Sequence, residues 1–132
     1  MIKNNETTPP RIKPRLFGAP KIRQLLWCDF PKDAQLPEFW KRRPVIIISY
    51  RNTLHGAVTI VPCSTLPQDG NPWAVPLKTS IDSQKSWAIC DKPTTIAVSR
   101  LSVHRGAVKR VSEREFDSIL EKLESWLPKR ST

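Results

Sequence analysis

The chain has few of the residues that phosphate-binding loops and metal sites require. It holds four glycines in 132 residues, too few and too scattered for a glycine-rich phosphate-binding loop. Its three cysteines, Cys28, Cys63 and Cys90, lie far apart in apolar surroundings and include no C-x-x-C pair. Neither histidine stands at zinc-ligand spacing from a cysteine. We therefore expect buried, reduced thiols, no metal site and no cofactor.

Long apolar stretches are also missing. No apolar run approaches 18 residues, and the polar N-terminus has no signal-peptide core. These absences predict a cytoplasmic protein that does not contact a membrane. Strands and helices do not alternate, which argues against a Rossmann or P-loop fold. A chain of 132 residues is long enough for one domain with its own hydrophobic core.

Acidic residues are outnumbered by basic ones. The chain has 22 Lys and Arg against 12 Asp and Glu, which gives a net charge of +10. This balance favours polyanionic partners, above all nucleic acid, over the alternatives of a merely basic protein or one that pairs with an acidic protein. Residues 1–24 hold six of the cations and four prolines without apolar periodicity. We predict a disordered basic arm at residues 1–22, either a phosphate-binding arm or a simple tail, and one folded domain at residues 23–132.

Apolar and β-branched segments recur at short intervals after the arm. The segment "PVIIISY" is almost continuously apolar, so we expect a strand that is buried on both faces. "QDGNP" predicts a turn at residues 68–72. The predicted strands are residues 24–30, 44–50, 57–63, 73–78, 86–90, 94–98 and 105–110.

One helix is predicted near the C-terminus. Ser112 and Glu115 have the spacing of a capping box, and Pro128 ends the helical pattern. Apolar residues then follow at helical spacing at positions 116, 119, 120, 123, 126 and 127. The fold class is therefore mainly β (α+β), a small barrel of five to seven short strands with a C-terminal amphipathic helix.

Polar side chains stand at the ends of several predicted strands, where loops on a rigid scaffold tend to carry function. Arg43 directly precedes Pro44 at the start of a strand, which makes it a candidate functional residue. The alternative to a functional role is a surface arginine held in a salt bridge. Ser64 and Asp91 each follow a strand. Of the five tryptophans, 27, 87 and 126 are expected in the core, whereas 40 and 73 fall in loops, where they would either stack on an unpaired base or pack.

The order "LLWCDF", "RRPVIIIS", "TIVPCST", "WAICDKPTTI" and "SRLSVHRGAV" resembles the MazF/PemK (Kid-like) family of toxin endoribonucleases from type II toxin–antitoxin systems. The resemblance covers roughly residues 24–127. It implies an SH3-like barrel, usually a homodimer, that cleaves single-stranded RNA without a metal. It also implies a cognate antitoxin whose flexible acidic tail occupies the RNA groove.

The resemblance implies four catalytic residues, Glu38, Arg43, Ser64 and Asp91, which match the family's motif positions. An arginine can bind phosphate oxygens with two parallel hydrogen bonds, and a carboxylate can take a proton. The chain departs from the motif in "EFWKRR", where the family has Gln and Gly, and at Ile89 and Ala97. The residues predicted to bind RNA are Trp40, Lys41, Arg42, His55, Thr65, Trp73 and Lys92, although His55 also suits a plain turn.

The sequence thus predicts the toxin of a type II system, a metal-independent endoribonuclease that uses the 2′-hydroxyl of RNA and leaves a 2′,3′-cyclic phosphate. Two alternatives remain open. One is a barrel that binds RNA or DNA and has lost nuclease activity. The other is a basic protein whose main role is to dock an acidic partner.

Overall fold

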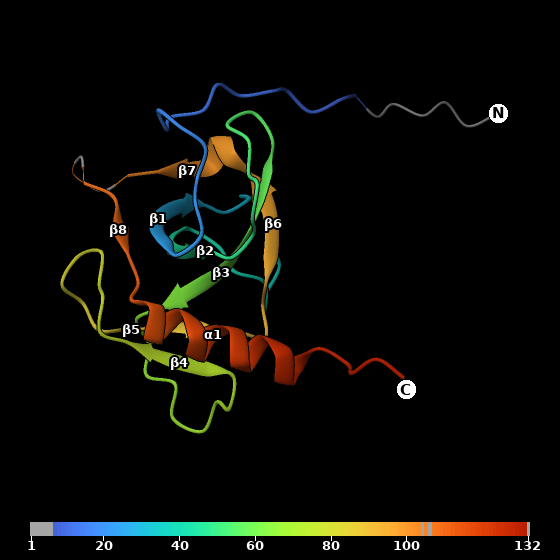
Figure 1. Ribbon diagram of the computed structural model, residues 1–132. Coiled ribbons are helices and arrows are strands. Elements are labelled where there is room, and N and C mark those ends of the chain that lie inside the picture. Colours follow the sequence, from blue (N-terminus) through green and yellow to red (C-terminus); the bar gives the residue numbers. More distant parts are fainter. Residues whose placement is uncertain (1–6, 104, 106, 132) are drawn as a thin grey trace.

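The computed structural model describes residues 7–103, 105 and 107–131. In it, one antiparallel sheet curls into a half-barrel and the helix α1 packs across one end (Figure 1). The mainly β fold with a C-terminal helix is confirmed. The elements are β1 (Gln24–Asp29), β2 (Arg42–Ile47), β3 (Ala57–Ser64), β4 (Ala74–Leu77), β5 (Ser86–Ile89), β6 (Thr94–Ala97), the 3-10 helix η1 (Val98–Arg100), β7 (Leu101–Ser102), β8 (Lys109–Arg110) and α1 (Glu113–Trp126).

Among the described residues the sheet has eight strands, one more than the upper end of the predicted range. The predicted strand at residues 105–110, of which Gly106 lies outside the described residues, is reduced to β8, and the two-residue β7 pairs with β1 before it. The neighbours along the sheet are β4-β5-β3-β2-β1-β7, with β6 also on β3 and β8 also on β1. The long strand β3 therefore has β6 beside its first half and β5 beside its end.

The central strands separate two hydrophobic cores, because successive side chains of a strand point to opposite faces. Ile46 lies in a cluster with Phe116, Ile119 and Leu123 of α1, which we call the helix-side core. Val45 and Ile47 lie in a second cluster with residues of β1, β3 and β6, which we call the inner core. The three β2 residues are fully buried, so the prediction of burial on both faces is confirmed for them. It is wrong for the end of the predicted segment, because the strand ends at Ile47 and Tyr50 is 77% exposed.

The capping box at the start of α1 is confirmed. The backbone N–H of Glu115 donates to Ser112 Oγ at 3.1 Å, and the backbone N–H of Ser112 donates to Glu115 Oε1 at 2.9 Å. The expectation that Trp126 belongs to the core is wrong, because its side chain is 39% exposed. Trp126 is the last residue of α1, whose C-terminal end projects past β4 (Figure 1).

Residues 7–22 contain no helix or strand, yet they contact the barrel. Leu16 packs against the inner core, and the carbonyl of Pro20 accepts a hydrogen bond from Asn52 Nδ2 at 3.0 Å. Residues 1–6 of the predicted arm lie outside the described residues. The division of the chain after residue 22 stays a prediction.

All three cysteines are buried and free of disulfides, as predicted. Burial raises the pKa of Cys28 and of Cys90 to about 12. In the described part of the chain, no helix has both the length and the hydrophobicity needed to cross a bilayer.

Candidate functional site

Arg43 and Ser64 lie at adjacent strand ends. Val45 on β2 pairs with Pro62 on β3, and the same antiparallel register continued by two residues aligns Arg43 with Ser64. Arg43 lies on the same face of β2 as Val45, and Ser64 lies on the same face of β3 as Ile60. Since Val45 and Ile60 both belong to the inner core, the two polar side chains project on the same side of the sheet.

The segment before β2 holds the Arg43 side chain in place. Its Nε donates to the carbonyl of Trp40 at 2.9 Å, and its guanidinium carbon lies 5.5 Å from the ring centroid of Phe39. Arg43 is half-buried and forms no salt bridge with any described residue. Within the described part of the chain it is therefore not the salt-bridged surface arginine of the alternative interpretation.

Glu38 lies in a pocket of about 630 Å³ beside Arg43. Its Oε1 accepts a hydrogen bond from the backbone N–H of Gln35 at 2.7 Å, which fixes the carboxylate. Phe39 forms part of the pocket wall and packs on Phe30 with ring centroids 5.9 Å apart. The lining residues are Phe30, Pro31, Asp33, Ala34, Gln35, Pro37, Glu38, Phe39, Lys92 and Thr94.

Asp91 lies in the turn between β5 and β6, next to this pocket. Its Oδ2 is 4.0 Å from Nζ of Lys92, a lining residue, and its Oδ1 is buried with no hydrogen-bond partner among the described residues. The pocket thus adjoins Arg43 through Phe39 and Asp91 through Lys92. A buried carboxylate oxygen without a partner is rare in proteins and often marks a functional group.

Three more of the predicted RNA-binding residues line a second hollow, of about 450 Å³. Trp40 is 44% exposed, and Nζ of Lys41 lies 4.1 Å from its ring centroid. Arg42 projects on the face opposite to Arg43, because the two are consecutive in β2. The hollow is lined by Asp29, Phe30, Pro31, Lys32, Trp40, Lys41 and Arg42.

The remaining predicted residues are more dispersed. Thr65, directly after Ser64, is exposed. Ser64 Oγ accepts a hydrogen bond from the backbone N–H of Leu66 at 3.2 Å. Trp73 is half-buried. Its carbonyl accepts a hydrogen bond at 2.9 Å from the backbone N–H of Cys90, the residue before Asp91. His55 precedes the start of β3 and is separated from Ser64 by the full length of that eight-residue strand, roughly 25 Å. The structure therefore does not bring His55 to the others.

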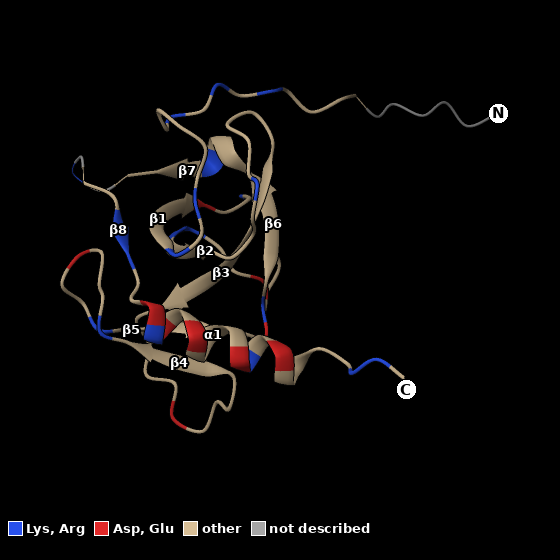
Figure 2. Ribbon diagram, in the orientation of Figure 1, with Lys and Arg blue, Asp and Glu red and all other residues tan. Residues whose placement is uncertain are grey.

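The charges are unevenly spread over the molecule (Figure 2). The helix α1 carries five acidic and two basic residues, whereas the N-terminal segment and β8 carry mainly cations. The positive excess therefore lies mainly on the N-terminal segment and around β8, while cations and acids alternate around the site itself. Within the described residues, no group of three or more His, Cys, Asp or Glu side chains is placed to hold a metal ion.

A family model, described as the PemK-like, MazF-like toxin of type II toxin-antitoxin systems, matches residues 21–127. The chain belongs to this family. The resemblance predicted from the five sequence segments is therefore confirmed. No curated protein sequence gives a significant match.

Solved structures of the family share the fold of this PemK/MazF-like chain. Mycobacterium tuberculosis toxin MazF-mt6 is 20% identical, with a TM-score of 0.58 over 79% of this chain and 95% of its own. An endoribonuclease from a mycobacterial species, solved in complex with its cognate antitoxin, is 21% identical, with a TM-score of 0.61 over 85% of this chain and 100% of its own. MazF from Deinococcus radiodurans is 18% identical, with a TM-score of 0.59 over 81% and 94%. At these identities the likeness concerns the fold alone.

Proposed function

We propose that this chain is the toxin of a type II toxin–antitoxin system and an endoribonuclease that cleaves single-stranded RNA. The observation that carries the proposal is the arrangement of Arg43, fixed by the Trp40 carbonyl and unpaired with any described carboxylate, in line with Ser64. Membership of the toxin family and the net charge of +10 support it.

The proposed reaction uses the RNA's own 2′-hydroxyl as the nucleophile. The 2′-oxygen attacks the adjacent phosphorus, its proton passes to a carboxylate, and the bond from phosphorus to the 5′-oxygen breaks. The leaving 5′-oxygen takes a proton from water, so the products are a 2′,3′-cyclic phosphate and a 5′-hydroxyl. Arg43 stabilises the charge that develops on the phosphate oxygens, and the Ser64 hydroxyl donates a hydrogen bond to them.

We assign the proton-accepting role to Asp91, because its Oδ1 has no hydrogen-bond partner in the part of the chain that the structure describes. Glu38 is the weaker candidate for that role, since its Oε1 already accepts a hydrogen bond from the backbone N–H of Gln35. We assign Glu38 to substrate positioning in the pocket. No step in this scheme requires a metal or another cofactor.

RNA binding is proposed to extend from the pocket to the exposed groups around it. Lys41, Arg42 and Lys92 would contact phosphates. The Thr65 hydroxyl would donate a hydrogen bond to a phosphate oxygen. Trp40, being 44% exposed, is the better surface for stacking an unpaired base, and Trp73 is half-buried. His55 is left out of the proposed site because it lies at the far end of β3.

The proposed partners are a second copy of this chain and a cognate antitoxin with a flexible acidic tail. The mycobacterial relative was solved with its cognate antitoxin, and a MazE–MazF complex is known from Deinococcus radiodurans. An acidic tail would complement the net charge of +10 of this chain. We propose that the chain acts in the cytoplasm, where RNA and antitoxin are available, and that residues 1–22 are an accessory basic arm.

The test is incubation of the purified chain with single-stranded RNA in excess EDTA, followed by mapping of fragments and their ends. We expect discrete fragments with 2′,3′-cyclic phosphates from the wild type and almost none from Arg43→Ala. Arg130→Ala is the matched control, because it removes the same charge from an exposed position near the C-terminus. Wild-type protein that binds RNA but yields no fragments would favour the alternative of a non-cleaving RNA- or DNA-binding barrel. Binding to an acidic protein alone would favour the docking alternative.

A further inference from the structure

The second hollow is basic, and a single acidic residue lines it. Lys32, Lys41 and Arg42 contribute cations, and Asp29 is the one acid among the lining residues. With the exposed Trp40 at its side, the hollow of about 450 Å³ suits the phosphates of a single-stranded nucleic acid. The Asp29 carboxylate is the group that would weaken such binding.

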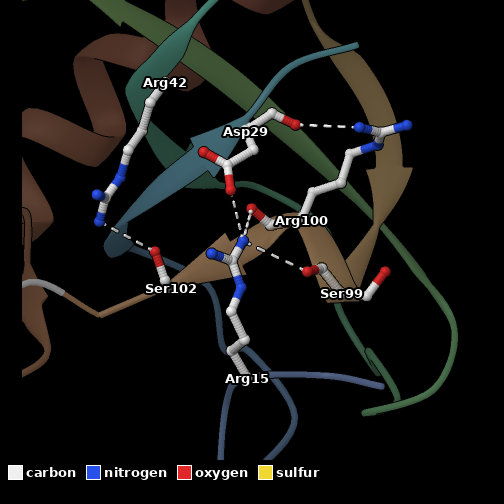
Figure 3. Close-up of polar contacts among 6 residues, drawn as sticks. All are labelled: Arg15, Asp29, Arg42, Ser99, Arg100 and Ser102. Atoms are coloured by element: carbon white, nitrogen blue, oxygen red, sulfur yellow. Dashed lines mark hydrogen bonds and ion pairs between the residues drawn. The ribbon is translucent and has the colours of Figure 1, made fainter. Parts of the chain in front are cut away.

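Asp29 and Arg42 are direct cross-strand neighbours. They pair in the register of β1 and β2, and both lie on the face of the sheet that carries Trp27. Opposite charges at such positions normally attract one another. Yet these two form no salt bridge; instead, the Arg42 guanidinium lies 5.0 Å from the Trp27 ring centroid and donates to Ser102 Oγ at 3.3 Å (Figure 3).

The Asp29 carboxylate is held by Arg15 from the N-terminal segment. Nη2 of Arg15 lies 2.8 Å from Asp29 Oδ2 and also donates to the carbonyls of Arg100 at 2.9 Å and Ser99 at 3.4 Å (Figure 3). The two carbonyls fix the guanidinium beside the carboxylate. Arg15 lies outside residues 21–127, so this contact is an addition to the part of the chain that matches the family.

We infer that Arg15 is a positioning residue that keeps Arg42 available for an RNA phosphate by holding Asp29 away from it. Without Arg15, Asp29 pairs with Arg42 across the two strands and the hollow loses one of its three cations. With Arg15 in place, the Asp29 charge is neutralised from outside the hollow. This inference rests on the proposed function, because it takes RNA as the ligand of the hollow.

The test measures binding of a short, mixed-sequence 2′-O-methyl oligoribonucleotide, which cannot be cleaved through its 2′-oxygen, by fluorescence anisotropy at low salt. Arg15→Ala should weaken binding about three- to five-fold, in keeping with the modest strength of exposed ion pairs. Adding Asp29→Asn to that variant should restore wild-type affinity, and Arg15→Lys should retain most of it. Arg42→Ala should cost much less affinity in the Arg15→Ala background than in the wild type.

The matched control is Arg11→Ala, which removes a cation of the same segment whose guanidinium donates to the carbonyl of His55 and not to Asp29. Asp29→Asn should change the affinity of the Arg11→Ala chain no more than it changes that of the wild type. Thermal unfolding identifies any variant that fails to fold. If Arg15→Ala fails to fold, Arg15→Lys is measured in its place, with and without Arg42→Ala. The loss of affinity caused by Arg42→Ala should then equal the loss it causes in the wild type.

Three outcomes would overturn the inference. Unchanged affinity in the Arg15→Ala chain shows that Asp29 does not compete for Arg42. Weakened affinity that Asp29→Asn fails to restore shows that Arg15 contacts the RNA itself. Each of these leaves the proposed function intact. A wild-type chain that binds no RNA refutes the proposed function and the inference together.

Discussion

Replacing Glu115 by Gln tests whether one carboxylate joins the helix to the sheet. Glu115 is 9% exposed and accepts four hydrogen bonds. Three come from Lys78 and Thr79, which follow β4, and the fourth comes from the backbone N–H of Ser112. Burial raises the pKa of Glu115, but the hydrogen bonds from Ser112, Thr79 and Lys78 together outweigh it and lower the pKa from 4.5 to about 2.

The sign and size of the effect on stability follow from this pKa. Because the pKa is lower in the folded chain than in the unfolded chain, the stabilisation is fully present above the unfolded value of 4.5 and disappears as the pH falls to about 2. That interval corresponds to about 3 kcal/mol in the free energy of unfolding at neutral pH. Glu115→Gln removes the charge while keeping the size of the side chain, so it should lose most of this amount.

The assay is urea unfolding of the wild type and of Glu115→Gln at pH 7 and at several values down to pH 2. We expect a difference of about 2–3 kcal/mol at pH 7, and we expect it to shrink as the wild-type carboxylate takes up its proton. Glu124→Gln is the control, because it removes an exposed acid from the same helix and should cost less than about 0.5 kcal/mol. A Glu115→Gln difference that stays constant from pH 7 to pH 2 would refute the reasoning.

The other predictions concern cleavage and thiol reactivity. Arg43→Ala should lower the initial rate of RNA cleavage by about 10²–10³ with little change in the unfolding midpoint, and a wild-type rate would remove Arg43 from the site. Asp91→Asn should slow cleavage far more than it weakens RNA binding; equal losses would make Asp91 a binding group only. RNA with a 2′-deoxy sugar just 5′ of the cut should resist cleavage, and normal cutting of that strand would exclude the 2′-hydroxyl as nucleophile. With the pKa of Cys28 and Cys90 near 12, only roughly 10⁻⁴ of each thiol is ionised at pH 8; DTNB should therefore react slowly until urea unfolds the chain, and rapid native labelling would contradict their burial.

Local signals in the sequence predicted the elements that depend on nearby residues. The β-branched run after Pro44 and the spacing of Ser112 and Glu115 carry their structural meaning within a few residues, so β2 and the start of α1 could be predicted. The exposure of Trp126 could not, because the apolar periodicity of the helix does not indicate where the sheet beneath it ends. The ion pair of Arg15 with Asp29 depends on tertiary packing.

The candidate site was predictable to the extent that it lies at strand ends. Arg43 and Ser64 were each placed beside a predicted strand, and the register of β2 with β3 brings them into line. The sequence also contained the signal that separates His55 from them, since His55 and Ser64 stand at opposite ends of one predicted strand. Phe39 and Lys32 were missed because an apolar wall and a lysine in a loop carry no distinctive pattern.

Two prolines bear on the alignment of the central strands. The run from Val45 to Ile47 is apolar on both faces, so a slip by one residue would exchange the two cores with little hydrophobic penalty. Pro44 pairs with β1 but lies before the first β2–β3 pair, and Pro62 lies in the gap between the β6 and β5 partners of β3. Each proline, lacking an N–H, thus occupies a position with a neighbour on one side only. A slip that moved Pro44 to the place of Val45 would put it between β1 and β3, where the residue is paired on both sides. Pro44 therefore disfavours that slip, and with it the loss of the alignment of Arg43 with Ser64.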